Sequence, residues 1–237
     1  MARRINRRME HRNKIPRPTV KRLSLYLREL ETRAEAQQGT ISSKQLGATL
    51  GLTDAQVRKD LAYFGQFGHP GIGYDIAELT GRLRTILRAD RTWNAALIGA
   101  GNLGRALMAY NGWTSRGFEI VAVFDANPDL TGHWVENHRV RPMSDLKKLV
   151  AEREIQLGVI AVPADSAQQV ADALIGAGVQ GILNFAPVRL DSRDQISIAS
   201  VDLAVSLEQL AFQVSLGMIG SLDEEDDDDQ PSRTNSD

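Results

Sequence analysis

The chain has 237 residues, 42% of them hydrophobic, so it has enough apolar material for one large core or two smaller ones. It lacks cysteine, which excludes disulfides and thiolate chemistry and fits a reducing cytoplasm. It also lacks the long apolar run of a membrane span or a secretory leader. The net charge of −2 conceals an asymmetry, because residues 1–91 carry +9 and residues 92–237 carry −11. Such a split predicts that the first half faces nucleic acid.

The first segment, residues 1–16, is a basic arm that we expect to be disordered. Residues 17–91 follow as a small helical domain. Pro18 suits a first helical turn, and apolar residues at three- and four-residue spacing continue until Gly39. This pattern predicts a first helix with one apolar face.

Two short helices come next, each with a capping signal at its start. Ser42 and Thr53 each stand three residues before a glutamine, ahead of helices expected over about 43–50 and 54–64. Short helices joined by a glycine-containing turn are typical of a helix-turn-helix, which we place at about Ser24 to Ala62.

The segment 65–74 contains four glycines and one proline in ten residues. This turn chemistry favours a β-hairpin wing over a helix. A further helix is expected over 75–88. Together these elements predict that residues 17–91 form a winged helix.

Arg58 and Lys59 lie off the apolar stripe of the helix at 54–64, and both side-chain types reach guanine in a major groove. The basic arm and the wing would hold phosphates or enter the minor groove. The alternative is a solvated helix face on a helical cap domain. The predicted DNA-binding residues are Arg58, Lys59, Ser43, Lys44, Gln56, His69 and Tyr74.

The second half of the chain alternates apolar runs with helical stretches. Strands are expected over 95–98, 119–124, 157–162 and 181–185. Strands this apolar, separated by helices, indicate a parallel sheet that is covered on both faces. We assign residues 92–203 to this α/β domain.

A glycine fingerprint follows the first of these strands. Gly99, Gly101 and Gly104 match G-x-G-x-x-G and open a helix. Glycines at these positions permit a tight turn, a close approach to a pyrophosphate and close packing of the helix on the sheet. The helix N-terminus then attracts the phosphates. The alternative is a glycine-rich turn in an α/β fold that binds no nucleotide.

Asp125 closes the next strand, about 20 residues after the fingerprint, where dinucleotide-binding domains carry an acidic residue. Its carboxylate would accept hydrogen bonds from ribose hydroxyls and repel a 2′-phosphate. Because no basic residue follows it in Ala126-Asn127-Pro128, we predict NAD(H) and not NADP(H) as the cofactor.

An enzyme is the alternative function for a chain with this nucleotide site. A dehydrogenase needs a proton donor or acceptor near the nicotinamide, and the candidates are His133, His138 and Tyr110. Both histidines fall in the polar connection Thr131–Arg141, which we expect to be an exposed loop. Tyr110 lacks a lysine four residues later. We therefore predict no catalytic residue and no metal site.

The C-terminal region is expected to hold a last helix over 204–222 and an acidic tail over 223–237. The tail includes seven consecutive carboxylates at 223–229, which repel one another, so we expect disorder there.

In combination, several segments resemble the Rex family of redox-sensing transcriptional repressors over roughly residues 15–218. They are Lys14-Ile15-Pro16, Arg22-Leu23, Tyr26-Leu27-Arg28, Val57-Arg58-Lys59-Asp60-Leu61, Tyr63-Phe64-Gly65, Gly71-Ile72-Gly73-Tyr74, the glycine fingerprint, Gly181-Ile182-Leu183-Asn184-Phe185-Ala186-Pro187 and Val201-Asp202-Leu203-Ala204. The resemblance implies a homodimer that binds a palindromic operator when the NADH/NAD+ ratio is low and leaves it when NADH binds. The basic arm and the acidic tail extend beyond the family core.

The resemblance also implies roles for single residues. The C-terminal helix would be a dimerisation helix that swaps between subunits. Tyr110 and Asp202 would be switch partners in the closed form, and Arg28 would compete for Asp202 in the open form. The loops that follow two strands would line the cofactor crevice. The predicted cofactor-binding residues are Gly99, Ala100, Gly101, Asn102, Leu103, Gly104, Asp125, Pro163, Asn184, Phe185, Ala186 and Pro187.

Two other functions stay open at this point. One is an NAD-dependent oxidoreductase with an accessory nucleic-acid-binding domain. The other is a winged-helix regulator whose Rossmann domain binds a different nucleotide. The predicted fold class is α/β in every case, with an N-terminal winged helix and a Rossmann domain. The resemblance to the Rex family adds that the C-terminal helix is swapped.

Overall fold

The computed structural model describes residues 15–68, 71–191 and 196–225. The chain divides into two compact units, Met1–Thr92 and Trp93–Asp237. Nearly all of the predicted basic arm, most of the acidic tail and His69 lie outside the described residues.

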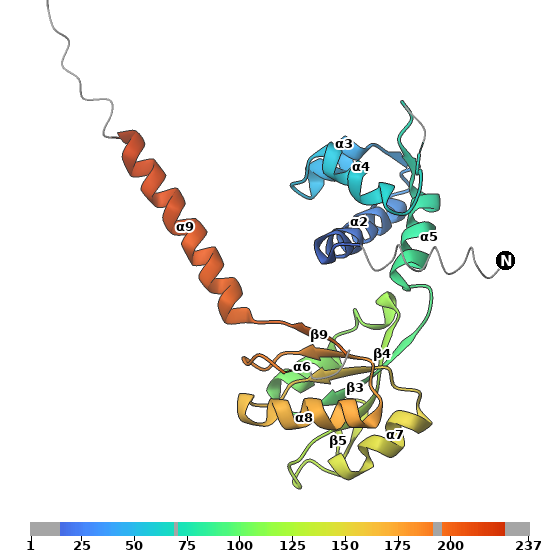
Figure 1. The fold of residues 1–237 in the computed structure, drawn as a ribbon, viewed down its shortest axis with the longest axis vertical. Coiled ribbons are helices and arrows are strands. Elements are labelled where there is room, and N and C mark those ends of the chain that lie inside the picture. Colours follow the sequence, from blue (N-terminus) through green and yellow to red (C-terminus); the bar gives the residue numbers. More distant parts are fainter. Residues whose placement is uncertain (1–14, 69–70, 192–195, 226–237) are drawn as a thin grey trace, which may run out of the picture. The chain divides into compact units, whose positions relative to one another are not determined.

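The N-terminal unit is a small helical domain built around one apolar core. Among the described residues, Leu23 and Leu30 of one helix pack in this core with Leu46, Leu61 and Leu83, each from a different helix. The unit contains α2 (Arg17–Glu35), β1 (Thr40–Ile41), α3 (Ser43–Thr49), α4 (Asp54–Ala62), β2 (Tyr74–Asp75) and α5 (Ile76–Leu87) (Figure 1).

Capping side chains set the starts of the two short helices. Ser42 Oγ accepts a hydrogen bond from the Gln45 N–H, and the Gln45 side chain accepts one from the Ser42 N–H. Thr53 Oγ1 accepts from the Gln56 N–H at the start of α4. Each cap satisfies an N–H that the helix itself leaves unpaired and contributes about 1 kcal/mol. Both helices begin where the sequence predicts.

The predicted hairpin wing lies partly outside the described residues, because residues 69 and 70 are not described. Residues 65–68 and 71–73, the described part of the loop, form no ladder with each other. The strand that closes the loop is β2, which pairs antiparallel with β1, so that Thr40 lies opposite Asp75 and Ile41 opposite Tyr74. A turn at residues 71–72 agrees with the glycine content, and β2 pairs with the segment before α3; the hairpin itself stays a prediction.

The C-terminal unit is a seven-stranded sheet with helices on both faces. The order is β5-β6-β4-β3-β7-β8-β9, and every neighbouring pair is parallel except β5 with β6. The strands are β3 (Trp93–Ile98), β4 (Phe118–Phe124), β5 (Trp134–Val135), β6 (His138–Arg141), β7 (Leu157–Ile160), β8 (Gly181–Asn184) and β9 (Ser197–Ser200). The chain leaves β3 for β4 on one side and later returns to β7 on the other, so the topological switch point lies at the end of β3.

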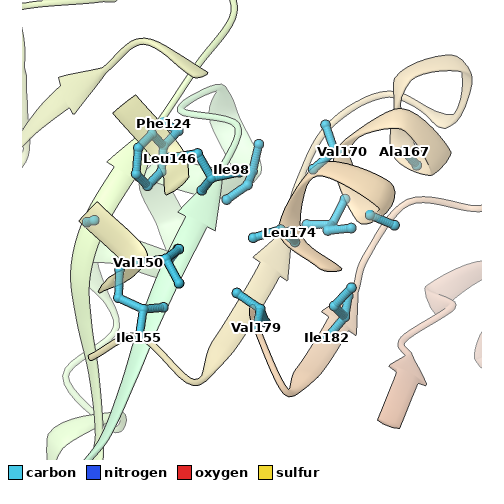
Figure 2. Close-up of a cluster of buried hydrophobic side chains, with 14 of the residues drawn as sticks. Ile98, Phe124, Leu146, Val150, Ile155, Ala167, Val170, Leu174, Val179 and Ile182 are labelled. Carbon is cyan, nitrogen blue, oxygen red and sulfur yellow. The ribbon is translucent and has the colours of Figure 1, made fainter. Parts of the chain in front are cut away.

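Each face of the sheet buries an apolar layer. Ile98 and Phe124 face Leu146 and Val150 of α7 and Leu174 of α8 (Figure 2). On the other face, Leu97, Val123 and Val140 pack with residues of α6. The helices are α6 (Asn102–Ala109), α7 (Leu146–Glu152), α8 (Ala164–Ala177) and α9 (Leu203–Glu225), with 3-10 turns at Thr114–Arg116 and Met143–Asp145.

The prediction of an exposed loop at Thr131–Arg141 is wrong, because this segment contains β5 and β6. Val135 and Val140 are buried, one from each strand. The two strands have two and four residues, too few for a period-two pattern to stand out among polar neighbours. The edge strand β9 was missed for the same reason.

The C-terminal helix α9 presents apolar side chains to solvent over residues 203–216. Leu203, Leu207, Leu210 and Val214 are all exposed. The helix continues to Glu225, three residues beyond the predicted end. In the part of the chain that the structure describes, no helix combines the length and apolar character needed to cross a membrane.

Candidate functional site

The glycine turn between β3 and α6 is held by close backbone contacts. Gly99 has φ 101°, and a Cβ there would lie 2.4 Å from the Ala161 carbonyl oxygen. A Cβ on Gly104 would lie 1.9 Å from the Gly99 carbonyl oxygen. Both glycines are therefore required by the protein itself, the first by its left-handed backbone and the second by helix–turn packing.

Gly101 differs from its two neighbours in the fingerprint. It is the N-cap of α6 and provides no side-chain acceptor for the first N–H groups of the helix. A Cβ at this position would meet no protein atom within 4 Å. The space beside the α6 N-terminus is thus open, and its unpaired N–H groups and helix dipole favour an anion.

Asp125 ties the end of β4 to the glycine turn. One carboxylate oxygen accepts the Ala100 N–H at 2.7 Å, and the other accepts the Asn127 N–H at 2.8 Å. The side chain is partly exposed and borders an open hollow of about 450 Å³. The other residues that line this hollow are Ala126, Pro128, Thr131, Pro142 and Met143, none of them basic.

The loop after β8 is folded around a buried asparagine. Asn184 Nδ2 donates to the Ala186 and Val188 carbonyl oxygens at 3.1 and 2.9 Å, and its Oδ1 accepts the Ala186 N–H. The polar atoms of Asn184 therefore shape the loop, whereas Pro187 is exposed. Pro163 is the residue that precedes α8 and follows the neighbouring strand β7. The strands β3, β7 and β8 are parallel neighbours in the sheet, so the loops that follow them lie at the same edge as the glycine turn.

The three predicted switch residues lie in different settings. Tyr110 is 58% exposed, and its ring contacts that of Trp113 edge-on, with 5.3 Å between the ring centroids. Asp202 precedes α9 and accepts the Ala204 and Val205 N–H groups through one oxygen. Arg28 is an exposed residue of α2 in the other unit. Their coupling stays a prediction.

In the N-terminal unit, a hydrogen bond joins the predicted contact residues of α3 and α4. Arg58 Nη1 donates to Ser43 Oγ at 3.3 Å and forms an ion pair with Asp54 at 2.6 Å. Lys44 and Lys59 are exposed. The Arg58 side chain also lowers the pKa of Asp54 below its ordinary value by hydrogen bonding to it.

Sequence reasoning missed a buried polar network that joins α2 to α4. Asp60 is 1% exposed and accepts hydrogen bonds from Arg22 Nε at 2.5 Å, Arg22 Nη2 at 2.7 Å and Tyr26 Oη at 2.8 Å. Thr19 and Gln56 complete the set of donors. The spacing in the sequence could have indicated that Asp60 is buried. Asp60 follows Val57 by three residues and so lies on the apolar face of its helix.

The charge state of Asp60 follows from these donors. Burial by itself would raise the pKa of the carboxyl group, but the hydrogen bonds from Arg22 and Tyr26 outweigh it and lower the pKa. The hydroxyl of Tyr26 responds in the opposite direction, because burial and the bond to Asp60 raise its pKa. The network therefore holds an ionised carboxylate in a buried position.

Two of the predicted DNA-contact residues are used inside the protein. Tyr74 is 8% exposed and packs in the helical core, where burial raises its pKa. Gln56 directs its amide at Asp60. We therefore leave both out of the interface, which retains Arg58, Lys59, Ser43 and Lys44.

The described residues contain no group of three or more His, Asp or Glu side chains that could hold a metal ion. His133 and His138 instead belong to the β5–β6 region, where His138 Nε2 bonds to the Ile120 carbonyl oxygen at 2.8 Å.

Comparison with known proteins gives matches in both units. The family model "Putative DNA-binding protein N-terminus" matches residues 14–62, and "CoA binding domain" matches residues 90–188. The chain is 48% identical over 201 residues to the redox-sensing transcriptional repressor Rex of Carboxydothermus hydrogenoformans, covering 85% of this chain and 97% of that relative.

Solved structures of a Rex-family repressor, RSP, resemble the whole described architecture. The complex of RSP with β-NAD+ and operator DNA matches with a TM-score of 0.81 and 34% identity, over 89% of this chain and 98% of that one. The complex with β-NADH matches with a TM-score of 0.80 and 33% identity, over 88% and 98%.

Proposed function

This chain belongs to the Rex family of redox-sensing transcriptional repressors, and on that premise we propose that it binds operator DNA as a homodimer and releases it when NADH binds. The observation that carries the proposal is the pairing of two sites in one chain. One unit presents basic residues on a capped helix-turn-helix. The other presents an open helix N-terminus beside an acidic residue at a topological switch point.

The glycine turn fits a dinucleotide, because a side chain at Gly101 would fill the space that a pyrophosphate needs. The N–H groups at the start of α6 would hold the phosphates, and Asp125 would accept hydrogen bonds from the ribose. When bound, the nicotinamide ring supplies the redox signal, since it is neutral when reduced and cationic when oxidised.

NAD(H) suits this site better than NADP(H). Asp125 is an acceptor whose charge repels a 2′-phosphate, and the hollow it borders has no basic residue among its described lining. A site for the phosphorylated cofactor would carry an arginine there.

The DNA contacts are assigned to Arg58, Lys59, Ser43 and Lys44. Arg58 must exchange its exposed ion pair with Asp54 for a base edge, and such a pair stabilises by only about 0.3–0.5 kcal/mol. A good contact to a base edge returns about 1–3 kcal/mol, so the exchange is favourable.

Dimerisation is assigned to α9. Leu203, Leu207, Leu210 and Val214 recur at three- and four-residue spacing and are exposed in a single chain. A second copy that covers this stripe would remove apolar surface from water. Two copies then present two recognition helices to an operator with two half-sites.

The redox response requires two states of the dimer. NADH must bind more tightly to the state that has left DNA, and by linkage operator DNA must weaken NADH binding by the same factor. Tyr110 and Asp202 are the proposed partners in the NADH-bound state, and Arg28 the competitor in the DNA-bound state. The protein acts through binding, with no catalytic residue, in the cytoplasm where its operator lies.

The test is an operator-binding titration at one fixed salt concentration, with NADH, NAD+ and NADPH in parallel. NADH should weaken operator binding, whereas NADPH at the same concentration should have little effect. Unchanged operator affinity at saturating NADH would contradict the sensor function.

Arg58→Ala should cost about 1–3 kcal/mol of operator binding and relax selectivity, with Arg82→Ala on the exposed face of α5 as the control.

A further inference from the structure

A second cavity lies in the C-terminal unit, between β4, the β5–β6 hairpin and α7. Its volume is about 270 Å³, and none of its lining residues borders the hollow beside Asp125. Its floor is apolar, with Val121 and Leu149, and its walls carry His138 and three arginines.

The cavity arises from an irregularity in β4. The β6 strand pairs with the last two residues of β4, so the start of β4 has an open edge on that side. A shift in the β3–β4 register leaves Val121 as an extra residue, and such bulges turn backbone groups out of the ladder. Arg153 donates to the Val121 carbonyl oxygen, and His138 bonds to that of Ile120. These two side chains therefore close the strand edge and wall the cavity.

The lining of the cavity carries positive charge from three arginines. None of the lining residues is acidic. Over residues 15–68, 71–191 and 196–225, Arg139, Arg141 and Arg153 form no ion pair. Arg139 donates to the Gly132 carbonyl oxygen, whereas the Arg141 side chain donates no hydrogen bond to a described residue. Guanidinium groups that gather without forming an ion pair attract an anion.

His138 supplies an independent signal. Its Nε2 is used by the Ile120 carbonyl, and its Nδ1 is buried without a hydrogen-bond partner among the described residues. Because a carbonyl oxygen only accepts, Nε2 carries the proton, and Nδ1 of the neutral ring is an acceptor. Buried polar atoms of native proteins almost always have a partner, so Nδ1 calls for a donor, such as a water or a hydroxyl group of the ligand. Trp134, 71% exposed at the rim, offers an apolar face to the carbon skeleton of such a ligand.

We propose that this cavity binds a small anionic metabolite, whose phosphate or carboxylate group is held by Arg141 together with Arg139 and Arg153. The planar fork of arginine pairs with either group through two parallel hydrogen bonds. The volume suits a small molecule, since sites for drug-sized ligands span about 300–1,000 Å³. The protein would thus receive a second metabolic signal at a site separate from the one proposed for NADH.

The test is calorimetric titration of the full-length protein with inorganic phosphate and, separately, with succinate at constant ionic strength. Saturable binding of at least one anion is expected. Arg141→Gln should weaken it about 10- to 100-fold, because a charge-assisted hydrogen bond is lost. Lys147→Gln is the matched control, since it removes one exposed positive charge from α7 without lining the cavity, and it should leave binding unchanged.

Two further measurements complete the test. Arg139→Gln provides a second variant, and thermal unfolding verifies that both arginine variants fold. Saturating NADH should leave anion binding intact, so the result does not depend on whether the protein responds to NADH. Absence of saturable binding, equal affinity in the arginine variants and the wild type, or displacement by NADH would each overturn the proposal.

Discussion

Asp60 and Asp125 each organise a functional segment, one in each unit, but they do so in different ways. Asp60 is buried, and five donor atoms from side chains on α2 and α4 surround it. Asp125 is partly exposed and accepts two backbone N–H groups. The first carboxylate is fully used inside the protein, whereas the second retains lone pairs that face an open hollow.

The difference in exposure separates a residue that positions a helix from a residue that can bind a ligand. Asp60 fixes the angle of the proposed recognition helix against α2 and has no free capacity for a ligand. Asp125 holds the glycine turn and still has capacity for one. Substitutions should therefore affect stability and operator binding at Asp60, and cofactor binding at Asp125.

The largest effect is expected for Asp60→Ala. Removing the carboxylate leaves the guanidinium of Arg22 and the hydroxyl of Tyr26 without their buried partner, which should cost about 3–5 kcal/mol of unfolding free energy. Denaturant unfolding measures this loss, and operator binding should fall with it while NADH binding persists. Asp54→Ala is the control, because its exposed ion pair contributes little. Equal effects of the two substitutions would contradict the positioning role.

Gly104→Ala is expected to act next most strongly. The new Cβ would lie 1.9 Å from the Gly99 carbonyl oxygen, a backbone atom, so one of the two backbone segments would have to shift. Such overpacking should cost about 1–3 kcal/mol of stability and abolish NADH binding, measured by thermal unfolding and fluorescence titration. Gly176→Ala in the exposed last turn of α8 meets no atom within 4 Å and should be neutral or slightly stabilising. Normal NADH binding by Gly104→Ala would show that the glycine turn is not part of the NADH site.

Asp125→Ala should weaken NADH binding about 10- to 100-fold, or about 1.5–3 kcal/mol, because hydrogen bonds to a charged acceptor are lost. The preference for NADH over NADPH should fall at the same time, since the repulsion of a 2′-phosphate disappears. Titration of both nucleotides measures the ratio. A ratio that does not change would show that Asp125 does not face the ribose.

The smallest expected effect is the dependence of stability on pH. The pKa of Asp60 is lower in the folded than in the unfolded state, where it is about 3.9. Its contribution is therefore present above that unfolded value and is lost as the pH falls through the folded one. Unfolding of the N-terminal unit between pH 7 and pH 2 should show this loss, and Asp60→Asn should show less of it. Identical acid profiles would exclude an ionised Asp60.

The sequence predicted the elements whose local chemistry is strong. Capping signals located the starts of α3 and α4, and apolar runs located the four central strands. The strands β5, β6 and β9 were missed because they are short and have polar neighbours, and long-range pairing stabilises them. The pattern of neighbouring residues in the sequence does not indicate which distant strands pair.

For the candidate site, local sequence located the glycine turn and Asp125 but not the uses of single side chains. Tyr74 and Gln56 fall in segments predicted to bind DNA, yet one packs in the core and the other contacts Asp60. The network around Asp60 joins residues up to 41 positions apart, so no spacing rule identifies it. Which face a polar residue takes is decided by tertiary packing.

The central claim is that the two units respond to each other through NADH and operator DNA. The most direct measurement is the affinity for NADH with and without saturating operator, alongside the affinity for operator with and without saturating NADH, at one salt concentration. Linkage requires both ratios to be equal, and a value of about 5–150 is typical of coupled sites. Operator that weakens NADH binding by the same factor by which NADH weakens operator binding would support the account. An NADH affinity unchanged by operator would contradict it.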